Sequence, residues 1–115
     1  EPIFEKFKNE RACPICKCGG YLKPATISFG QNLKGEDLRR AQKAANRCDL
    51  VIALGSTLSV SPANTIPLIA AQAGTPYIII NRDETDHDDL TQVTLRLTGN
   101  VENLFPPAVK KALQF

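Results

Sequence analysis

Two short apolar runs, each stopped by small or polar residues, constrain the fold of this chain most strongly. The first covers residues 50–54 and ends at Gly55-Ser56-Thr57; the second covers residues 76–80 and ends at Asn81. Continuous apolar runs of this length predict strands buried on both faces of a parallel sheet. The chain is therefore expected to have an α/β fold.

Helical patterns lie between and around these runs. Pro67 predicts that the second helix has an irregular first turn or begins near Ile66, and Pro106-Pro107 predicts that the last helix is interrupted or restarted. Strands that alternate with helices form a parallel sheet with right-handed crossovers, here half of a doubly wound, Rossmann-like domain over residues 25–115. The predicted helices are 36–48, 62–73 and 100–113, and two further short strands are predicted at 26–29 and 93–97.

The residues that follow the two apolar runs are candidate ligand contacts. In an open α/β sheet, ligands bind at the carboxyl ends of the strands. Gly55 lets the backbone approach a ligand, Ser56 and Thr57 supply hydroxyls, and Asn81 can hydrogen-bond a ribose. Ordinary strand-ending turns are the alternative interpretation.

The cysteines predict part of a zinc site. Cys13 and Cys16 form one CxxC turn, Cys18 precedes Gly19-Gly20, and no second CxxC exists. A structural site needs four ligands, commonly from two such turns, so residues 1–24 are expected to be a partial zinc module. Cys18 is an alternative zinc ligand. The CxxC turn could instead be a redox motif or have no special role. Cys48 fits the apolar stripe of helix 36–48, where a packing role is expected.

His87 is the only histidine and lies in the run Asp86-His87-Asp88-Asp89. Such a charged run predicts a solvated loop, so we expect a surface histidine rather than a base or a metal ligand. No arrangement of serine or cysteine with histidine predicts a nucleophile.

Composition excludes several classes of partner. The net charge is +2 with scattered basic residues, and no apolar run approaches the roughly 20 residues of a membrane span, so neither nucleic acid nor a membrane is expected as a partner. The clustered cysteines favour a reducing compartment, and we expect a cytoplasmic protein. The absence of methionine suggests a piece of a longer chain.

Five motifs together resemble the C-terminal half of a sirtuin, an NAD-dependent protein deacylase. They occur in the family's order and spacing from about Cys13 to Leu113. The motifs are the CxxC turn, Gly-Gly-Tyr-Leu-Lys-Pro at 19–24, Phe-Gly-Gln at 29–31, Gly-Ser-Thr-Leu-Ser-Val-Ser-Pro-Ala at 55–63, and Ile-Asn at 80–81.

The resemblance implies roles for individual residues. NAD contacts fall on Gly55, Ser56, Thr57, Asn81, Arg82 and Asp83, with Asn100 or Val101 at the adenine. Ile27, Phe29, Gly30 and Gln31 are implied to line the acyl-lysine channel and to pair with the substrate backbone. An acetylated peptide would lie as an added strand between these residues and Leu58-Ser59-Val60. The family's zinc is structural, which implies the same for Cys13 and Cys16.

The chain also departs from the sirtuin pattern. Gln31 replaces the usual glutamate, and Ser56-Thr57 stands where Thr-Ser is common. Three features of the family precede the matching segment: the glycine-rich phosphate loop, the catalytic histidine and the first cysteine pair. The catalytic histidine of the family comes before the zinc cysteines, whereas His87 comes after all of the matching motifs, so His87 does not correspond to it. The resemblance therefore assigns no catalytic residue here and implies that this chain alone is inactive.

Three functions remain as hypotheses. The leading one is the C-terminal part of an NAD-dependent protein deacetylase; the others are a non-catalytic nucleotide-binding module and a zinc-knuckle interaction module. A half sheet leaves an unpaired edge and apolar surface, so we also expect the isolated chain to self-associate.

Overall fold

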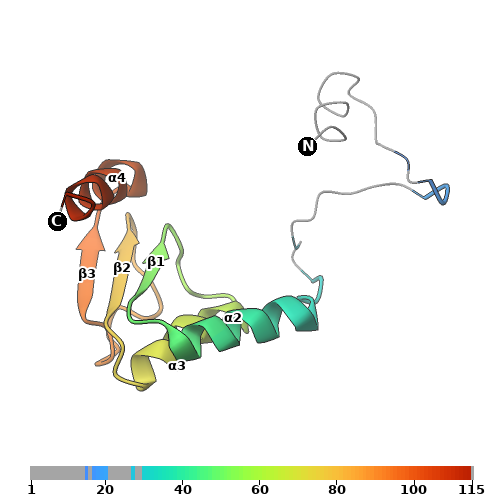
Figure 1. The fold of residues 1–115 in the computed structure, drawn as a ribbon, viewed down its shortest axis with the longest axis horizontal. Coiled ribbons are helices and arrows are strands. Elements are labelled where there is room, and N and C mark those ends of the chain that lie inside the picture. Colours follow the sequence, from blue (N-terminus) through green and yellow to red (C-terminus); the bar gives the residue numbers. More distant parts are fainter. Residues whose placement is uncertain (1–14, 16, 21–26, 28–29, 115) are drawn as a thin grey trace. The chain divides into compact units, whose positions relative to one another are not determined.

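The structure, a computed structural model, describes residues 15, 17–20, 27 and 30–114 (Figure 1). The chain divides into two compact units, residues 1–33 and 34–115. Cys13, Cys16, Phe29 and most of the predicted strand 26–29 lie outside the described residues. The predicted boundary between modules at residue 24 stays a prediction.

The second unit contains a three-stranded parallel sheet, as the apolar runs predict. Its strands are β1 (Val51–Leu54), β2 (Tyr77–Asn81) and β3 (Leu95–Thr98), in the order β1-β2-β3 (Figure 1). Val51 pairs with Tyr77, and Ile78 pairs with Leu95. The predicted strands 50–54, 76–80 and 93–97 are thus confirmed to within two residues at their ends.

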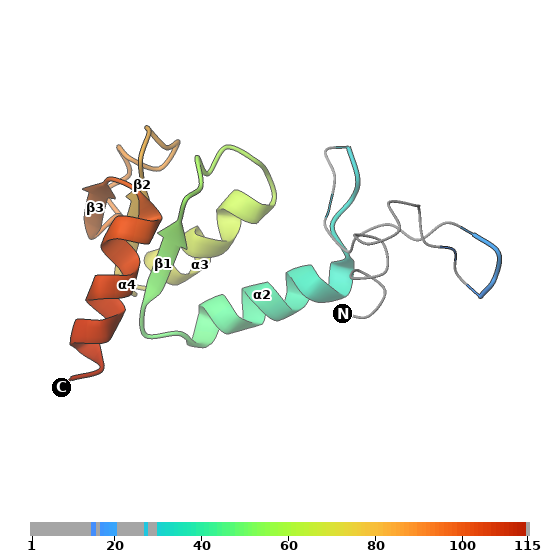
Figure 2. The ribbon, with the colours of Figure 1, turned by 90° about the horizontal axis from the view of Figure 1, so that it is seen from above.

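Three segments of helix precede or connect the first two strands. Helix α2 (Gly35–Arg47) packs against α3 (Ile66–Gln72), and α3 packs against β1 and β2 (Figure 2). A 3-10 turn, η1 (Ala63–Thr65), precedes α3, and Pro67 lies in the first turn of α3. Both expectations for this helix are met, because a proline costs no helical hydrogen bond in the first turn.

The last helix, α4 (Val101–Ala112), corrects one prediction. It continues through Pro106 and Pro107 without a break. These prolines leave the carbonyls of Glu102 and Asn103 without their helical N–H donors. Both of those residues are exposed, so water can satisfy the two carbonyls, and this removes much of the penalty that led us to predict an interruption.

The face of the sheet that contacts α3 carries the core. Leu58, Ala71, Tyr77 and Ile79 form a buried cluster. Val51, Ala53, Leu68 and Val93 pack around that cluster. Because side chains alternate along a strand, the odd-numbered residues of β1 and β2 point toward α3.

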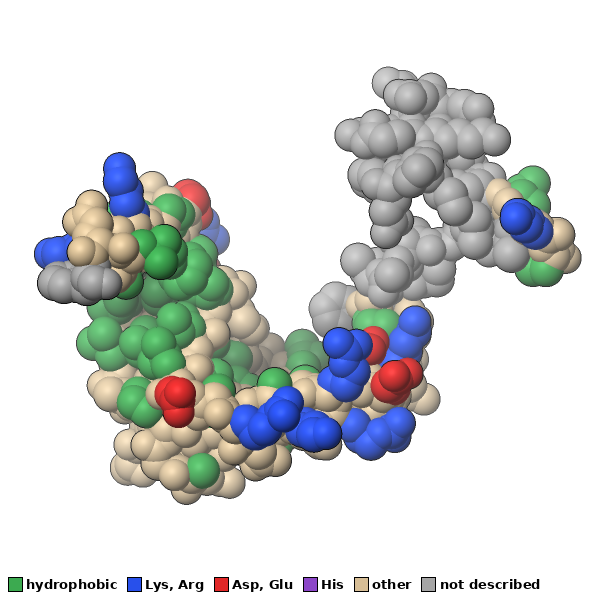
Figure 3. Space-filling view, viewed as in Figure 1, with side chains coloured by type: hydrophobic (Ala, Val, Ile, Leu, Met, Phe, Trp, Pro, Cys, Tyr) green, Lys and Arg blue, Asp and Glu red, His purple; other side chains and the backbone are tan. Residues whose placement is uncertain are grey.

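The opposite face of the sheet is also apolar but incompletely covered. Alternation and register place six aliphatic residues on it: Ile52, Leu54, Ile78, Ile80, Leu95 and Leu97. Ile80 is buried, whereas Leu54 is 39% exposed and Leu95 is 46% exposed. Figure 3 shows hydrophobic side chains gathered over the strands. The prediction that strand 50–54 is buried on both faces is therefore wrong for the described part of the chain.

Candidate functional site

The turns that follow the three strands meet at one edge of the sheet. The Gly55 N–H donates to the Ile80 carbonyl at 2.8 Å, and the Gly99 N–H donates to the Asn81 carbonyl at 3.2 Å. These bonds link the end of β1 to the end of β2, and the end of β2 to the turn before α4. The sheet thus gathers Gly55, Asn81 and the start of α4, as the carboxyl-edge argument predicts.

Gly55 lies beside the first residue of α4. Its φ is +64°, a left-handed conformation that favours glycine, and a Cβ built on it would lie 3.5 Å from Val101 Cγ2. Gly55 and Val101, predicted as contacts of one ligand from different motifs, are neighbours in the fold. A ligand at this edge can approach the Gly55 backbone more closely than it could with any side chain present.

The hydroxyls after Gly55 also shape their own loop. Ser56 Oγ accepts from the Leu58 N–H at 3.0 Å, and the hydroxyls of Thr57 and Ser59 lie 2.9 Å apart. Ser56, Thr57 and Ser59 are all exposed. Each hydroxyl that accepts or donates within the loop keeps further hydrogen-bonding capacity for a ligand.

Leu58 anchors this loop and was not predicted as a core residue. It is 7% exposed and has a φ of +58°, and its carbonyl accepts from Asn64 Nδ2 at 3.1 Å. One sequence signal could have indicated its burial: Leu58 is an apolar residue with hydroxyl residues on both sides.

Asn81 forms a tight turn with the residues that follow it. Asn81 is 8% exposed, and its Nδ2 donates to the Asp83 carbonyl at 2.9 Å. Arg82 and Asp83 form a solvent-exposed ion pair at 3.3 Å. The predicted triplet Asn81-Arg82-Asp83 is therefore one turn, with its asparagine inside and its charged side chains outside.

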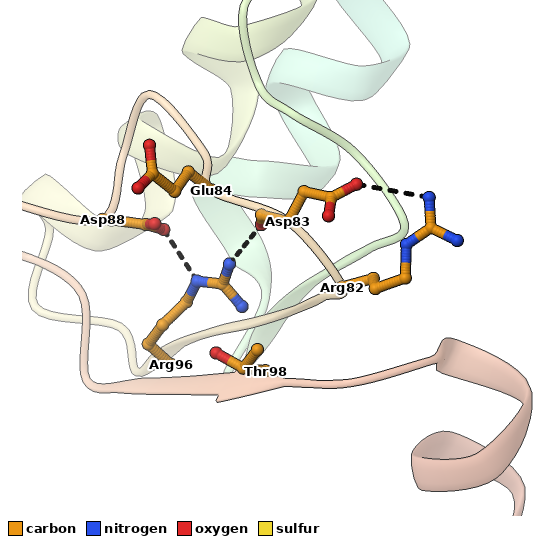
Figure 4. Close-up of a pocket in the computed structure, with 6 residues that line it drawn as sticks. All are labelled: Arg82, Asp83, Glu84, Asp88, Arg96 and Thr98. Carbon is orange, nitrogen blue, oxygen red and sulfur yellow. Dashed lines mark hydrogen bonds and ion pairs between the residues drawn. The ribbon is translucent and has the colours of Figure 1, made fainter.

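Arg96 on β3 holds this turn and was missed in the sequence. Its Nη1 donates to the carbonyls of Asn81, at 3.0 Å, and Leu97, and its Nη2 donates to the carbonyl of Asp83 at 2.5 Å. Its Nε donates to Asp88 Oδ1 at 2.7 Å (Figure 4). An open pocket here is lined by Arg82, Asp83, Glu84, Asp88, Arg96 and Thr98.

Asp88 is fixed from both sides. The Thr85 hydroxyl donates to Oδ1 at 2.5 Å and the Thr85 N–H donates to Oδ2 at 3.0 Å. These two bonds from Thr85, followed by the bond and the charge of Arg96, lower the pKa of Asp88 to about 2. The carboxylate is thus ionised at neutral pH and keeps Arg96 oriented.

The structure corrects the prediction of a surface histidine at position 87. His87 is 4% exposed, and its Nδ1 lies 2.8 Å from Tyr77 Oη. Burial lowers its pKa, although the charges of Asp86 and Asp88 act in the opposite direction. The acidic run is not a uniformly solvated loop, because Thr85 and His87 point inward while Asp86 points outward.

The same loop contacts the first turn. The Asp86 N–H donates to the Thr57 carbonyl at 2.9 Å. The loop after β2 thus supports both the Asn81 turn, through Asp88 and Arg96, and the turn that follows β1.

The predicted substrate residues fall in both units. Ser59 and Val60 are exposed in the loop after β1, and Ile27, Gly30 and Gln31 are exposed in the first unit. Phe29 lies outside the described residues. The roles of these residues in binding a substrate remain predictions.

The zinc module is not shown by the structure. Over residues 15, 17–20, 27 and 30–114, no group of three or more His, Cys, Asp and Glu could hold a metal ion. Cys13 and Cys16 lie outside that set, and Cys18 is exposed. The Cys48 thiol is half-buried and donates to the Ala45 carbonyl at 3.4 Å, in agreement with a packing role.

A parallel sheet with small and polar residues at its carboxyl edge defines the class of Rossmann-like α/β domains. Comparison with known families is more specific: the sequence model of the Sir2 family matches residues 1–62. This chain belongs to the Sir2, or sirtuin, family.

No helix among its described residues is long and apolar enough to cross a membrane.

Curated relatives agree with this assignment. The chain is 41% identical over 83 residues to an NAD-dependent protein deacetylase of Halalkalibacterium halodurans, which covers 72% of this chain and 35% of that protein. It is 35% identical over 109 residues to an NAD-dependent protein deacetylase of Sulfurisphaera tokodaii, which covers 95% of this chain and 42% of that protein. The chain thus spans well under half the length of these relatives.

Solved structures of Sir2 enzymes have the same fold. A Sir2 structure determined in a study of the mechanism and regulation of these enzymes superposes with a TM-score of 0.77 at 32% identity, covering 96% of this chain and 46% of that one. A Sir2 complex with a p53 peptide and NAD⁺ gives a TM-score of 0.74 at 30% identity, covering 99% and 47%.

Proposed function

We propose that this chain is the C-terminal part of an NAD-dependent protein deacetylase and that it binds the adenosine side of NAD. Its membership of the sirtuin family and the names of its relatives support this proposal. In this function the sheet forms half of a doubly wound domain, acting in a reducing compartment such as the cytoplasm.

The proximity of Gly55 to Val101, beside Asn81, is the observation that carries the proposal. Gly55 presents bare backbone, Ser56 and Thr57 present exposed hydroxyls, and Asn81 ends the adjoining strand. Hydroxyl groups suit the phosphate and ribose oxygens of a dinucleotide, and a glycine lets such a ligand lie close to the main chain. Arg82, Asp83 and Val101 complete the proposed contact set, and NAD supplies the nicotinamide leaving group when it is bound.

The acetylated substrate is assigned to the same chain. We assign residues 27–31 and residues 58–60 to the binding of an acyl-lysine peptide as an added strand, in which backbone groups would bind the peptide and side chains would select it. Cys13 and Cys16 are assigned as half of a structural zinc site, with the other ligands outside this sequence.

We propose that the chain is inactive alone. Sirtuin chemistry uses a histidine base that precedes the segment matched here, and His87 cannot replace it. His87 is buried, and its Nδ1 is paired with Tyr77. A buried and paired imidazole cannot take a proton from a ribose hydroxyl that lies outside the core.

The test is nicotinamide release by the full-length gene product supplied with NAD and an acetylated peptide. We expect release that depends on both substrates, and none from residues 1–115 alone. Asn81→Ala should raise the KM for NAD, whereas the KM for the peptide should hardly change. NAD binding by the full-length protein without nicotinamide release would instead favour a non-catalytic nucleotide-binding module. A full-length protein that neither binds NAD nor releases nicotinamide would refute the proposal.

A further inference from the structure

Arg96 is the most highly connected side chain at the carboxyl edge of the sheet. It donates to one carboxylate, that of Asp88, and to three backbone carbonyls, those of Asn81, Asp83 and Leu97. The side chain of Arg96 is only 18% exposed. The sheet pairing brings it here, because Asn81 pairs with Thr98, two residues beyond Arg96.

Two of these acceptors define the turn after β2. The carbonyls of Asn81 and Asp83 both point at one guanidinium, so the backbone between them has little freedom. Asn81 Nδ2 bonds to the same Asp83 carbonyl and closes the turn from inside. A planar guanidinium can serve several acceptors in fixed directions, whereas an ammonium group is a compact point charge.

Asp88 fixes the guanidinium itself. Its Oδ1 accepts from Arg96 Nε (Figure 4). Thr85 holds the carboxylate through a hydroxyl and a backbone N–H. All three nitrogens of the Arg96 guanidinium donate to acceptors within the chain. The pair is built to hold the turn, and the turn carries three of the proposed NAD contacts.

We propose that Arg96 and Asp88 are positioning residues, which hold the Asn81-Arg82-Asp83 turn in the conformation that binds the adenosine ribose of NAD. This inference depends on the proposed function, because it needs NAD at that turn. It assigns the two residues no contact with the cofactor.

The test measures KM for NAD and KM for acetylated peptide in the full-length gene product. Arg96→Met should raise the KM for NAD about 10-fold, because hydrogen bonds from a charged group are lost. The KM for peptide should stay within about twofold, because the peptide residues lie in other segments. Asp88→Ala should act like Arg96→Met, and Asp88→Asn, which keeps an oxygen acceptor for Arg96 Nε, should restore most of the NAD affinity.

Arg47→Met is the matched control, because Arg47 is an exposed arginine in α2. It should leave both KM values unchanged. If Arg96→Met does not fold, Arg96→Lys and Asp88→Ala carry the test, with NAD affinity measured by calorimetry on the folded protein. An equal rise of both KM values would indicate a general structural role and overturn the inference.

Asn81→Ala separates this inference from the proposed function. If Asn81→Ala raises the KM for NAD while the Arg96 and Asp88 variants do not, the positioning role is wrong and the NAD site stands. If none of these variants changes the KM for NAD, the turn does not bind NAD, and both proposals fail at this site.

Discussion

Tyr77 Oη and His87 Nδ1 lie 2.8 Å apart inside the second unit, with their rings in an edge-to-face arrangement 5.9 Å between centroids. Burial, followed by the charge of Asp88, raises the pKa of Tyr77 to about 12, and burial lowers the pKa of His87. The tyrosine is therefore protonated and the histidine neutral at pH 7, and the two groups share one hydrogen bond whose direction depends on the imidazole tautomer.

This pair predicts acid sensitivity in the chain. His87 is neutral in the folded state at pH values where an unfolded histidine is already protonated, so the unfolded state binds more protons. Stability should be complete above the ordinary histidine pKa of about 6.5 and fall below it, by at most about 1.4 kcal/mol per pH unit. Urea unfolding of residues 1–115 between pH 7.5 and 5.0 measures this slope, and His87→Gln should remove most of it.

Removing the tyrosine hydroxyl should destabilise the chain at pH 7. Tyr77→Phe leaves His87 Nδ1 buried without its hydrogen-bond partner, at a cost of about 1–3 kcal/mol in the free energy of unfolding. The matched control is Thr91→Val, which removes an exposed hydroxyl from the loop before β3. Equal stabilities of Tyr77→Phe and the wild type by urea unfolding would contradict this prediction.

A side chain at position 55 should weaken NAD binding. Gly55→Ala places a Cβ at the predicted contact surface and requires a φ of +64°, which costs a non-glycine residue about 1–2 kcal/mol. Gly74→Ala is the control, since Gly74 has a φ of +93° and open space around its Cβ position. Both variants should lose stability, and only Gly55→Ala should lose NAD affinity in calorimetry of the full-length gene product.

The uncovered face of the sheet should drive self-association of the isolated chain. Leu54 and Leu95 are exposed on that face, and a contiguous apolar surface promotes association. Leu54→Lys or Leu95→Lys should shift the sedimentation of residues 1–115 toward the monomer, whereas Thr91→Lys should not. A wild-type chain that stays monomeric at high concentration would sink this prediction.

The sequence predicts the elements of this fold well because their signals are local. Apolar runs locate β1 and β2, and the amphipathic stripe that ends near Cys48 locates α2. The same holds for the site residues that follow strands, since the end of an apolar run also marks the end of a strand. Gly55 and Asn81 could therefore be predicted to lie at one edge.

The support of the site could not be predicted in this way. Arg96 reaches Asn81, Asp83 and Asp88 only because β3 pairs with β2 in one particular register. The burial of His87 depends on the packing of the loop after β2 against Tyr77. The neighbouring aspartates predict a solvated loop instead, so the sequence gives no sign of this packing. Pairings between distant segments leave no local signal in a single sequence.

The proximity of Gly55 to Val101 brings the end of the first strand beside the beginning of the last helix, although 45 residues separate the two along the chain. In the proposed enzyme, the start of α4 would therefore form a wall of the dinucleotide pocket. A premature stop codon or a protease cut shortly before residue 101 would abolish cofactor retention, even with every glycine and hydroxyl of the first turn intact.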